Sequence, residues 1–155
     1  MNNKYINIYN NLVNLTRNKD LYTNLNEQDT FSDRLVFFLL HFAFFLRAYK
    51  KSDKRTLQEI YDYIFKQLEL SIREIGYGDV SINKKMKDYI NLFHAIINKI
   101  ENWNLINLNE KNKIIKSLLN TDNNDDLIVY FDNFSVELVK NTFNFYIKSV
   151  IKPKK

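Results

Sequence analysis

The segment that decides the fold is LVFFLLHFAFFL, which occupies residues 35–46 of the 155-residue chain. Its apolar side chains recur at helical spacing, and they cover the opposite face of the helix as well. A helix that is apolar all round lies at the centre of a protein, or a partner covers its second face. The segment is too short to cross a membrane, because a spanning helix needs about 20 apolar residues. We therefore expect residues 30–49 to form a central helix, begun by Thr30 with Asp33 at the spacing of a capping box.

Helical spacing continues on both sides of this central helix. Only two Gly and one Pro occur in the chain, which favours long helices over an architecture of many turns. The other helices are expected at residues 5–15, from a cap at Ser52 or Asp53 to Ile75, from a cap at Asp79 or Ser81 to about Trp103, at 110–119, and at 125–151. The length suits one domain with its own core. The expected fold is therefore all-α, a single compact bundle of about six helices that spans residues 1–155 as one domain.

The overall composition limits which cellular compartment and which classes of partner we expect. The chain has no Cys, so disulfides, thiolate metal sites and Cys nucleophiles are excluded. Its first residues lack the apolar run of a signal peptide and the Arg-rich character of a transit peptide. We expect a cytoplasmic protein whose contact with a membrane is at most peripheral, at the inner face. The net charge of +5 favours anionic partners, such as RNA, anionic lipid or an acidic protein.

No pattern of side chains indicates catalysis or a bound metal. His41 lies inside the central apolar helix and His94 follows Phe93, and neither has a second ligand-type residue three or four positions away. Because metal sites need three or four ligands, we expect no metal and no cofactor. No Ser–His–Asp arrangement, paired carboxylates or nucleotide fingerprint is visible, so we expect no enzyme. His41 is predicted to be a polar anchor, in the core or at the floor of a groove.

Both glycines fall in one short loop, Gly76-Tyr77-Gly78-Asp79-Val80. Gly76 can adopt the left-handed conformation that ends a helix, and Gly78 permits a second sharp turn. The loop is not a phosphate loop, because no strand precedes it and no Gly-Lys-Ser/Thr follows. It is either a purely structural corner between two helices or a corner that presents charged side chains to a partner.

Two basic clusters could contact phosphate groups, or could simply be the solvated ends of helices. No groove-reading motif accompanies either of them, and we expect no DNA partner. The clusters are Lys84, Lys85 and Lys87 after the glycine loop, and Arg47, Lys50, Lys51, Lys54 and Arg55 after the central helix.

The glycine loop belongs to a longer pattern. In chain order the pattern is Asp29-Thr30-Phe31-Ser32-Asp33-Arg34, Leu40-His41, Arg73-Glu74-Ile75-Gly76-Tyr77-Gly78-Asp79, Lys84-Lys85-Met86-Lys87 and Phe93. It resembles the ubiquinol–cytochrome c chaperone family from about residue 29 to residue 103, and Arg-Glu-x-Gly-x-Gly-Asp is its most specific element. Ile75 stands where bacterial members have Met, and His94 stands where members tend to have Tyr. The chain is similar to the compact bacterial branch, which lacks the membrane-anchoring N-terminal extension of mitochondrial members.

The resemblance implies an assembly chaperone. Members assist the biogenesis of respiratory complex III, holding newly made cytochrome b until cofactors and partner subunits join. The implied partners are cytochrome b or another complex III subunit, a second assembly factor and the ribosomal tunnel exit. The residues expected to form the partner-binding corner are Arg73, Glu74, Gly76, Gly78, Asp79, Lys84, Lys85 and Lys87. The alternative is a ribosome- or RNA-binding helical module without chaperone activity.

Overall fold

The computed structural model describes residues 4–23, 25, 31–119, 121–141 and 143–148. The α-helices are α1 (Ile6–Thr16), α2 (Phe31–Ala48), α3 (Lys54–Ile75), α4 (Asp79–Ile100), α5 (Leu108–Leu118), α6 (Asp125–Lys140) and α7 (Phe143–Lys148). Two 3₁₀ turns, η1 (Lys19–Tyr22) and η2 (Trp103–Leu105), connect them. Over these ranges there is no strand, only an isolated antiparallel bridge between Leu25 and Thr121. The all-α prediction is confirmed, with seven α-helices in place of about six.

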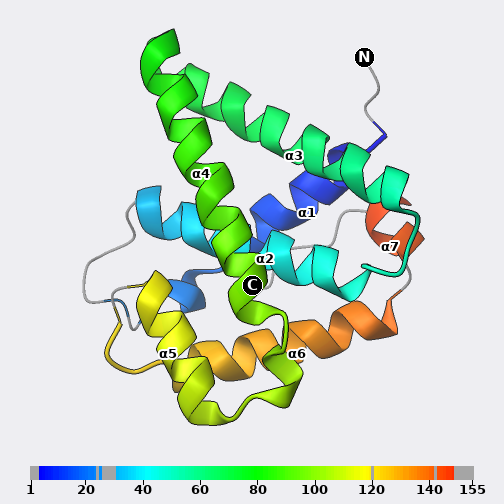
Figure 1. The fold of residues 1–155 in the computed structure, drawn as a ribbon, viewed down its shortest axis with the longest axis vertical. Coiled ribbons are helices and arrows are strands. Elements are labelled where there is room, and N and C mark those ends of the chain that lie inside the picture. The colour runs from blue at the N-terminus through cyan, green and yellow to red at the C-terminus, as the bar shows by residue number, and fades with distance from the viewer. Residues whose placement is uncertain (1–3, 24, 26–30, 120, 142, 149–155) are drawn as a thin grey trace.

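Helix α2 runs through the middle of the molecule (Figure 1), and α1, α4 and α6 pack against it. All of residues 37–45 are buried. Phe42 stacks on Phe93 of α4, with 5.0 Å between ring centroids, and Phe44 stacks on Phe131 of α6 at 5.2 Å. Helix α1 packs against α2 as well. The second apolar face of α2 is therefore covered by the chain itself, so this helix does not offer its apolar surface to a partner.

The prediction of one helix over residues 125–151 is wrong in its extent, because α6 ends at Lys140. Asn141 is extended, with φ −93° and ψ 144°, and α7 turns back to pack against α1. The hydroxyl of Tyr49 is 2.8 Å from the Leu138 carbonyl and 3.0 Å from the Asn141 carbonyl, so it satisfies the end of α6. The break buries Tyr146 against the aromatic end of α2. Helical spacing runs on through the break without Gly or Pro, and the sequence pattern therefore hid it.

The two ends of the described chain meet where α7 docks on α1. The Asn7 side-chain amide donates to the Ile147 carbonyl at 2.7 Å, and the Asn11 amide donates to the Tyr146 carbonyl at 3.3 Å. Asn11 is buried, so its hydrogen bond satisfies a polar group that would otherwise be stranded in the core.

Some predicted helix ends agree with the structure and others do not. Asp53 caps α3, and its side chain accepts from the Arg55 amide. Helix α4 begins one residue earlier than the predicted cap at Asp79 allowed and three residues earlier than the cap at Ser81, because Gly78 is its N-cap and Asp79 is its first residue. Helix α4 also ends at Ile100, before the turn at η2. The predicted cap at Thr30 lies outside the described residues.

Candidate functional site

The corner between α3 and α4 is built by the two glycines. Gly76 ends α3 in the left-handed region, with φ +104°, and its amide donates to the Arg73 carbonyl at 3.0 Å. A side chain is disfavoured at such a φ, so Gly fits this position. Gly78 is extended and begins α4. No atom lies within 4 Å of where a Cβ would stand at either glycine, so the loop projects into open space. In Figure 1 the corner lies at one end of the molecule, far from α5 and α6.

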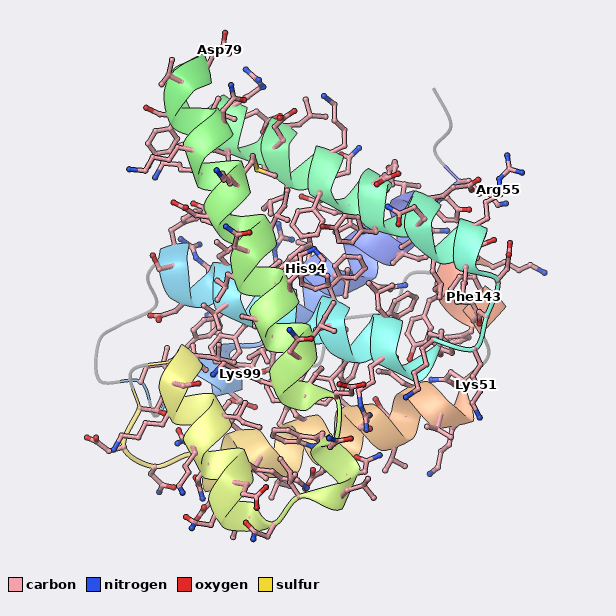
Figure 2. The ribbon with its side chains drawn as sticks, viewed as in Figure 1. Lys51, Arg55, Asp79, His94, Lys99 and Phe143 are labelled. Carbon is pink, nitrogen blue, oxygen red and sulfur yellow. The ribbon has the colours of Figure 1, made fainter. Side chains whose placement is uncertain are left out.

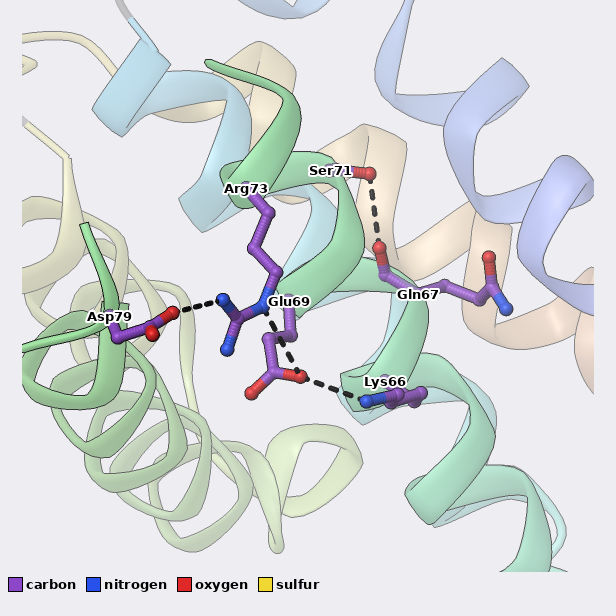
Figure 3. A network of polar contacts seen from close by, with 6 residues as sticks. All are labelled: Lys66, Gln67, Glu69, Ser71, Arg73 and Asp79. Carbon is purple, nitrogen blue, oxygen red and sulfur yellow. Dashed lines mark hydrogen bonds and ion pairs between the residues drawn. The ribbon is translucent and has the colours of Figure 1, made fainter. Parts of the chain in front are cut away.

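A chain of ion pairs ties the two helices together behind the loop (Figure 3). Arg73 Nη1 is 2.6 Å from Asp79 Oδ1, and its Nε is 4.0 Å from Glu69 Oε2. Lys66 Nζ lies 3.1 Å from the same Glu69 oxygen. The hydrogen bond to Asp79 raises the pKa of Arg73. These contacts are largely exposed, so they hold the geometry of the corner more than they add to its stability.

The structure brings the predicted charged residues to this one corner. Glu74, Lys84 and Lys87 are exposed. Lys85 is half-buried, and its Nζ lies 4.6 Å from the centre of the Tyr77 ring. This geometry is that of a cation over an aromatic face. The charges therefore surround the glycine loop on the α4 side, and α3 contributes the paired Arg73.

Sequence reasoning missed the apolar character of the corner. Ile75 is 58% exposed, Tyr77 is 43% exposed and Val80 is 86% exposed. A signal was present, because three large apolar residues alternate with two glycines in a loop whose other residues are polar. Ile75 follows Leu68 and Ile72 at helical spacing, and both of these are buried, so spacing alone predicts that Ile75 is buried too. The corner is therefore an apolar tip, formed by Ile75, Tyr77 and Val80, with lysines behind it.

His41 lies far from this corner, in the core between α2 and α6. It is fully buried, and its Nδ1 donates to the Phe37 carbonyl at 2.6 Å. Its Nε2 accepts from the Tyr130 hydroxyl, also at 2.6 Å. A carbonyl can only accept, so the bond to Phe37 places the single proton of the neutral ring on Nδ1 and leaves Nε2 as the acceptor. Burial lowers the pKa of His41 to about 4. His41 is a core link between two helices.

The second basic cluster is a separate surface at the connection of α2 to α3. Lys50, Lys51, Lys54 and Arg55 are exposed, whereas Arg47 is half-buried and donates to the Glu101 carbonyl at 3.2 Å. In Figure 2 Lys51 and Arg55 lie at the right, near the start of α3, whereas Asp79 lies at the top, beyond the other end of α3. The two basic clusters therefore cannot act as one continuous surface.

Three further features bear on metal binding, ligand binding and membrane crossing. Across the described ranges, no three His, Cys, Asp or Glu side chains gather in a way that could hold a metal ion. An open polar groove between α5 and the start of α6 is lined by Asn, Lys and Asp side chains, including Lys113, Lys116 and Asp125. None of the helices described has both the length and the apolar character needed to span a membrane.

Comparison with known proteins identifies the family of this chain. No curated protein and no solved structure matches it significantly. The family model described as Ubiquinol-cytochrome C chaperone matches residues 23–102, which is just over half of the chain. The match takes in α2, α3, α4 and the glycine corner between the last two. The chain therefore belongs to the ubiquinol-cytochrome C chaperone family.

Proposed function

We propose that this protein holds newly made cytochrome b during the assembly of respiratory complex III, by binding and without turnover. Membership of the family gives it a chaperone role in complex III assembly in general terms. The single observation that carries the proposal is the family match over residues 23–102, because it includes both the central helix and the glycine corner. Cytochrome b as the client is the finer part of the proposal.

The α3–α4 corner is the proposed surface for the client or for another complex III subunit. A chaperone for a membrane protein has to meet apolar client segments, and the middle of α2 does not offer them because residues 37–45 are buried. The exposed tip formed by Ile75, Tyr77 and Val80 offers apolar area where it is accessible. The proposed partner-binding residues around the tip are Arg73, Glu74, Gly76, Gly78, Asp79, Lys84, Lys85 and Lys87.

Further partners extend this proposal. A second assembly factor and the ribosomal tunnel exit are proposed contacts of the same assembly step. Peripheral contact with the inner face of the membrane is also proposed, since a membrane client is inserted there. The two basic clusters are compatible with each of these anionic or mixed surfaces.

Binding to RNA without chaperone activity is the competing function, and the exposed lysines at both clusters favour it. The two functions differ in their dependence on salt. Phosphate contacts release counterions, so an RNA-binding protein loses affinity steeply as salt rises. A salt series on binding to RNA therefore separates the two functions.

Deletion of the gene in the native host tests the proposal. We expect the absorbance of cytochrome b in membranes to fall, while an unrelated membrane complex stays near normal. Pull-down of the tagged chain with mass spectrometry should then recover cytochrome b or another complex III subunit. Normal cytochrome b spectra in the deletion strain would contradict the proposed function.

A further inference from the structure

We infer that the α3–α4 corner docks on a bilayer surface rich in anionic lipid, with its apolar tip in the headgroup region and its lysines on the lipid phosphates. The inference rests on the proposed function in one respect, because it names the membrane as a partner of the proposed site. Its physical grounds are the apolar tip, the placement of the lysines and the pairing of the nearby carboxylates.

The tip has the shape and chemistry of an interfacial anchor. Ile75 is the last residue of α3, Tyr77 lies in the loop and Val80 is the second residue of α4, so all three stand at the projecting end of the α3–α4 hairpin (Figure 1). Scattered exposed apolar residues are ordinary, but three at one projecting end form a site that water solvates poorly. Tyr is well suited to the boundary between water and lipid, because its ring is apolar and its hydroxyl is polar.

The lysines are placed to reach phosphates when the tip is inserted. Val80, Lys84 and Lys87 occupy positions i, i+4 and i+7, so they share one exposed face of α4. With a rise of 1.5 Å per residue, Lys84 lies about 6 Å and Lys87 about 10 Å behind Val80 along the axis. Helical side chains lean towards the N-terminus of their helix, which here means towards the tip. Their ammonium groups can therefore extend to the headgroups while their stems cover apolar surface.

The carboxylates of the corner are largely neutralised by neighbours. Asp79 is ion-paired with Arg73 at 2.6 Å, and Glu69 is paired with Lys66 at 3.1 Å. Glu74 is exposed, and Asp88 lies on α4 at nearly the same distance behind Val80 as Lys87, so three lysines of α4 (Lys84, Lys85 and Lys87) stand against this one further carboxylate. The charge nearest the tip on the α4 side is therefore positive, which complements the negative surface potential of anionic lipid.

Flotation of the purified full chain with lipid vesicles tests the inference. We expect binding to vesicles of phosphatidylcholine with about a third phosphatidylserine, little binding to pure phosphatidylcholine, and loss of binding as salt rises. The double variant Lys84→Glu with Lys87→Glu should lower the affinity about tenfold or more. The variant Val80→Ser leaves the charge unchanged and should also lower the affinity, because the tip inserts.

The chain offers a matched control on α5. Lys113 and Lys116 are exposed, have the same three-residue spacing as Lys84 and Lys87, and lie at the other end of the molecule. The variant Lys113→Glu with Lys116→Glu changes the net charge equally, and it should retain vesicle binding within about twofold. Thermal melts of all variants verify that each one is folded.

Any one of four results would overturn the inference. The first three are no binding of the folded wild-type chain to anionic vesicles, equal losses of affinity in the two double variants, and unchanged binding of Val80→Ser. The fourth is that the variant Lys84→Glu with Lys87→Glu no longer pulls down cytochrome b although its vesicle binding is intact. The last result would assign the corner to a protein partner. The vesicle measurements need no client, so their failure is distinct from failure of the chaperone function, which shows in the cytochrome b spectra of the deletion strain and in the pull-down of the wild-type chain.

Discussion

Acidification should destabilise this protein through one buried side chain, His41. The imidazole is fully buried and neutral, and burial lowers its pKa to about 4, whereas an unfolded His titrates near 6.5. Below pH 6.5 the unfolded chain therefore binds a proton that the folded chain excludes, so stability is full above pH 6.5 and falls as pH drops towards 4. Proton linkage between these two pKa values gives a loss of about 2 kcal/mol on going from pH 7 to pH 5.

Urea melts at pH 7, 6 and 5 measure this loss directly. The variant His41→Gln should be less stable at pH 7, but its free energy of unfolding should depend less on pH by about 2 kcal/mol over the same interval. The variant His94→Gln is the matched control, because His94 is the other histidine and its side chain is exposed. It should retain the pH dependence of the wild type. The reasoning about His41 is refuted if His41→Gln and the wild type lose the same stability between pH 7 and pH 5.

Three further substitutions test the helix ends and the connection to α6, each by thermal or urea melts. Gly76→Val should destabilise the chain by about 1–2 kcal/mol or more, because a branched side chain is strained at φ +104°, whereas Gly78→Ala should be nearly neutral; equal effects would contradict the assignment. Trp103→Phe should cost about 1–3 kcal/mol, since it removes the 2.7 Å hydrogen bond from the indole Nε1 to Asp132; a neutral result would show that this bond is dispensable. Tyr49→Phe should cost about 1 kcal/mol by leaving the carbonyls at the end of α6 without their hydroxyl donor, and unchanged melting would argue against that capping role.

The sequence alone was enough to find α2 and its place at the centre. An all-round apolar helix has two explanations, burial or a covering partner, and the buried residues 37–45 decide for burial. The positive φ of Gly76 was also predictable, because few other residues tolerate a left-handed helix end. Local periodicity and glycine chemistry sufficed for these features.

Features that depend on tertiary contacts were beyond the sequence pattern. The break after Lys140 has no Gly or Pro to mark it, and it exists because α7 gains burial by folding back on α1. The partners of His41 lie 4 and 89 positions away, so the bond to Tyr130 could not be read from spacing. The placement of the charged residues at one corner follows from their positions around the glycine loop, but the exposure of Val80 was not predicted, because a sequence does not show which apolar side chains are left uncovered.

The docking of α7 on α1 bears on how this protein is made. Its hydrogen bonds join residues 135 and 140 positions apart, from the opposite ends of the described chain. During synthesis α1 emerges well before α7, the segment that covers it. The growing polypeptide therefore carries the apolar stripe of α1 incompletely covered until α7 has been made, so this member of a chaperone family passes through an incompletely folded stage of its own.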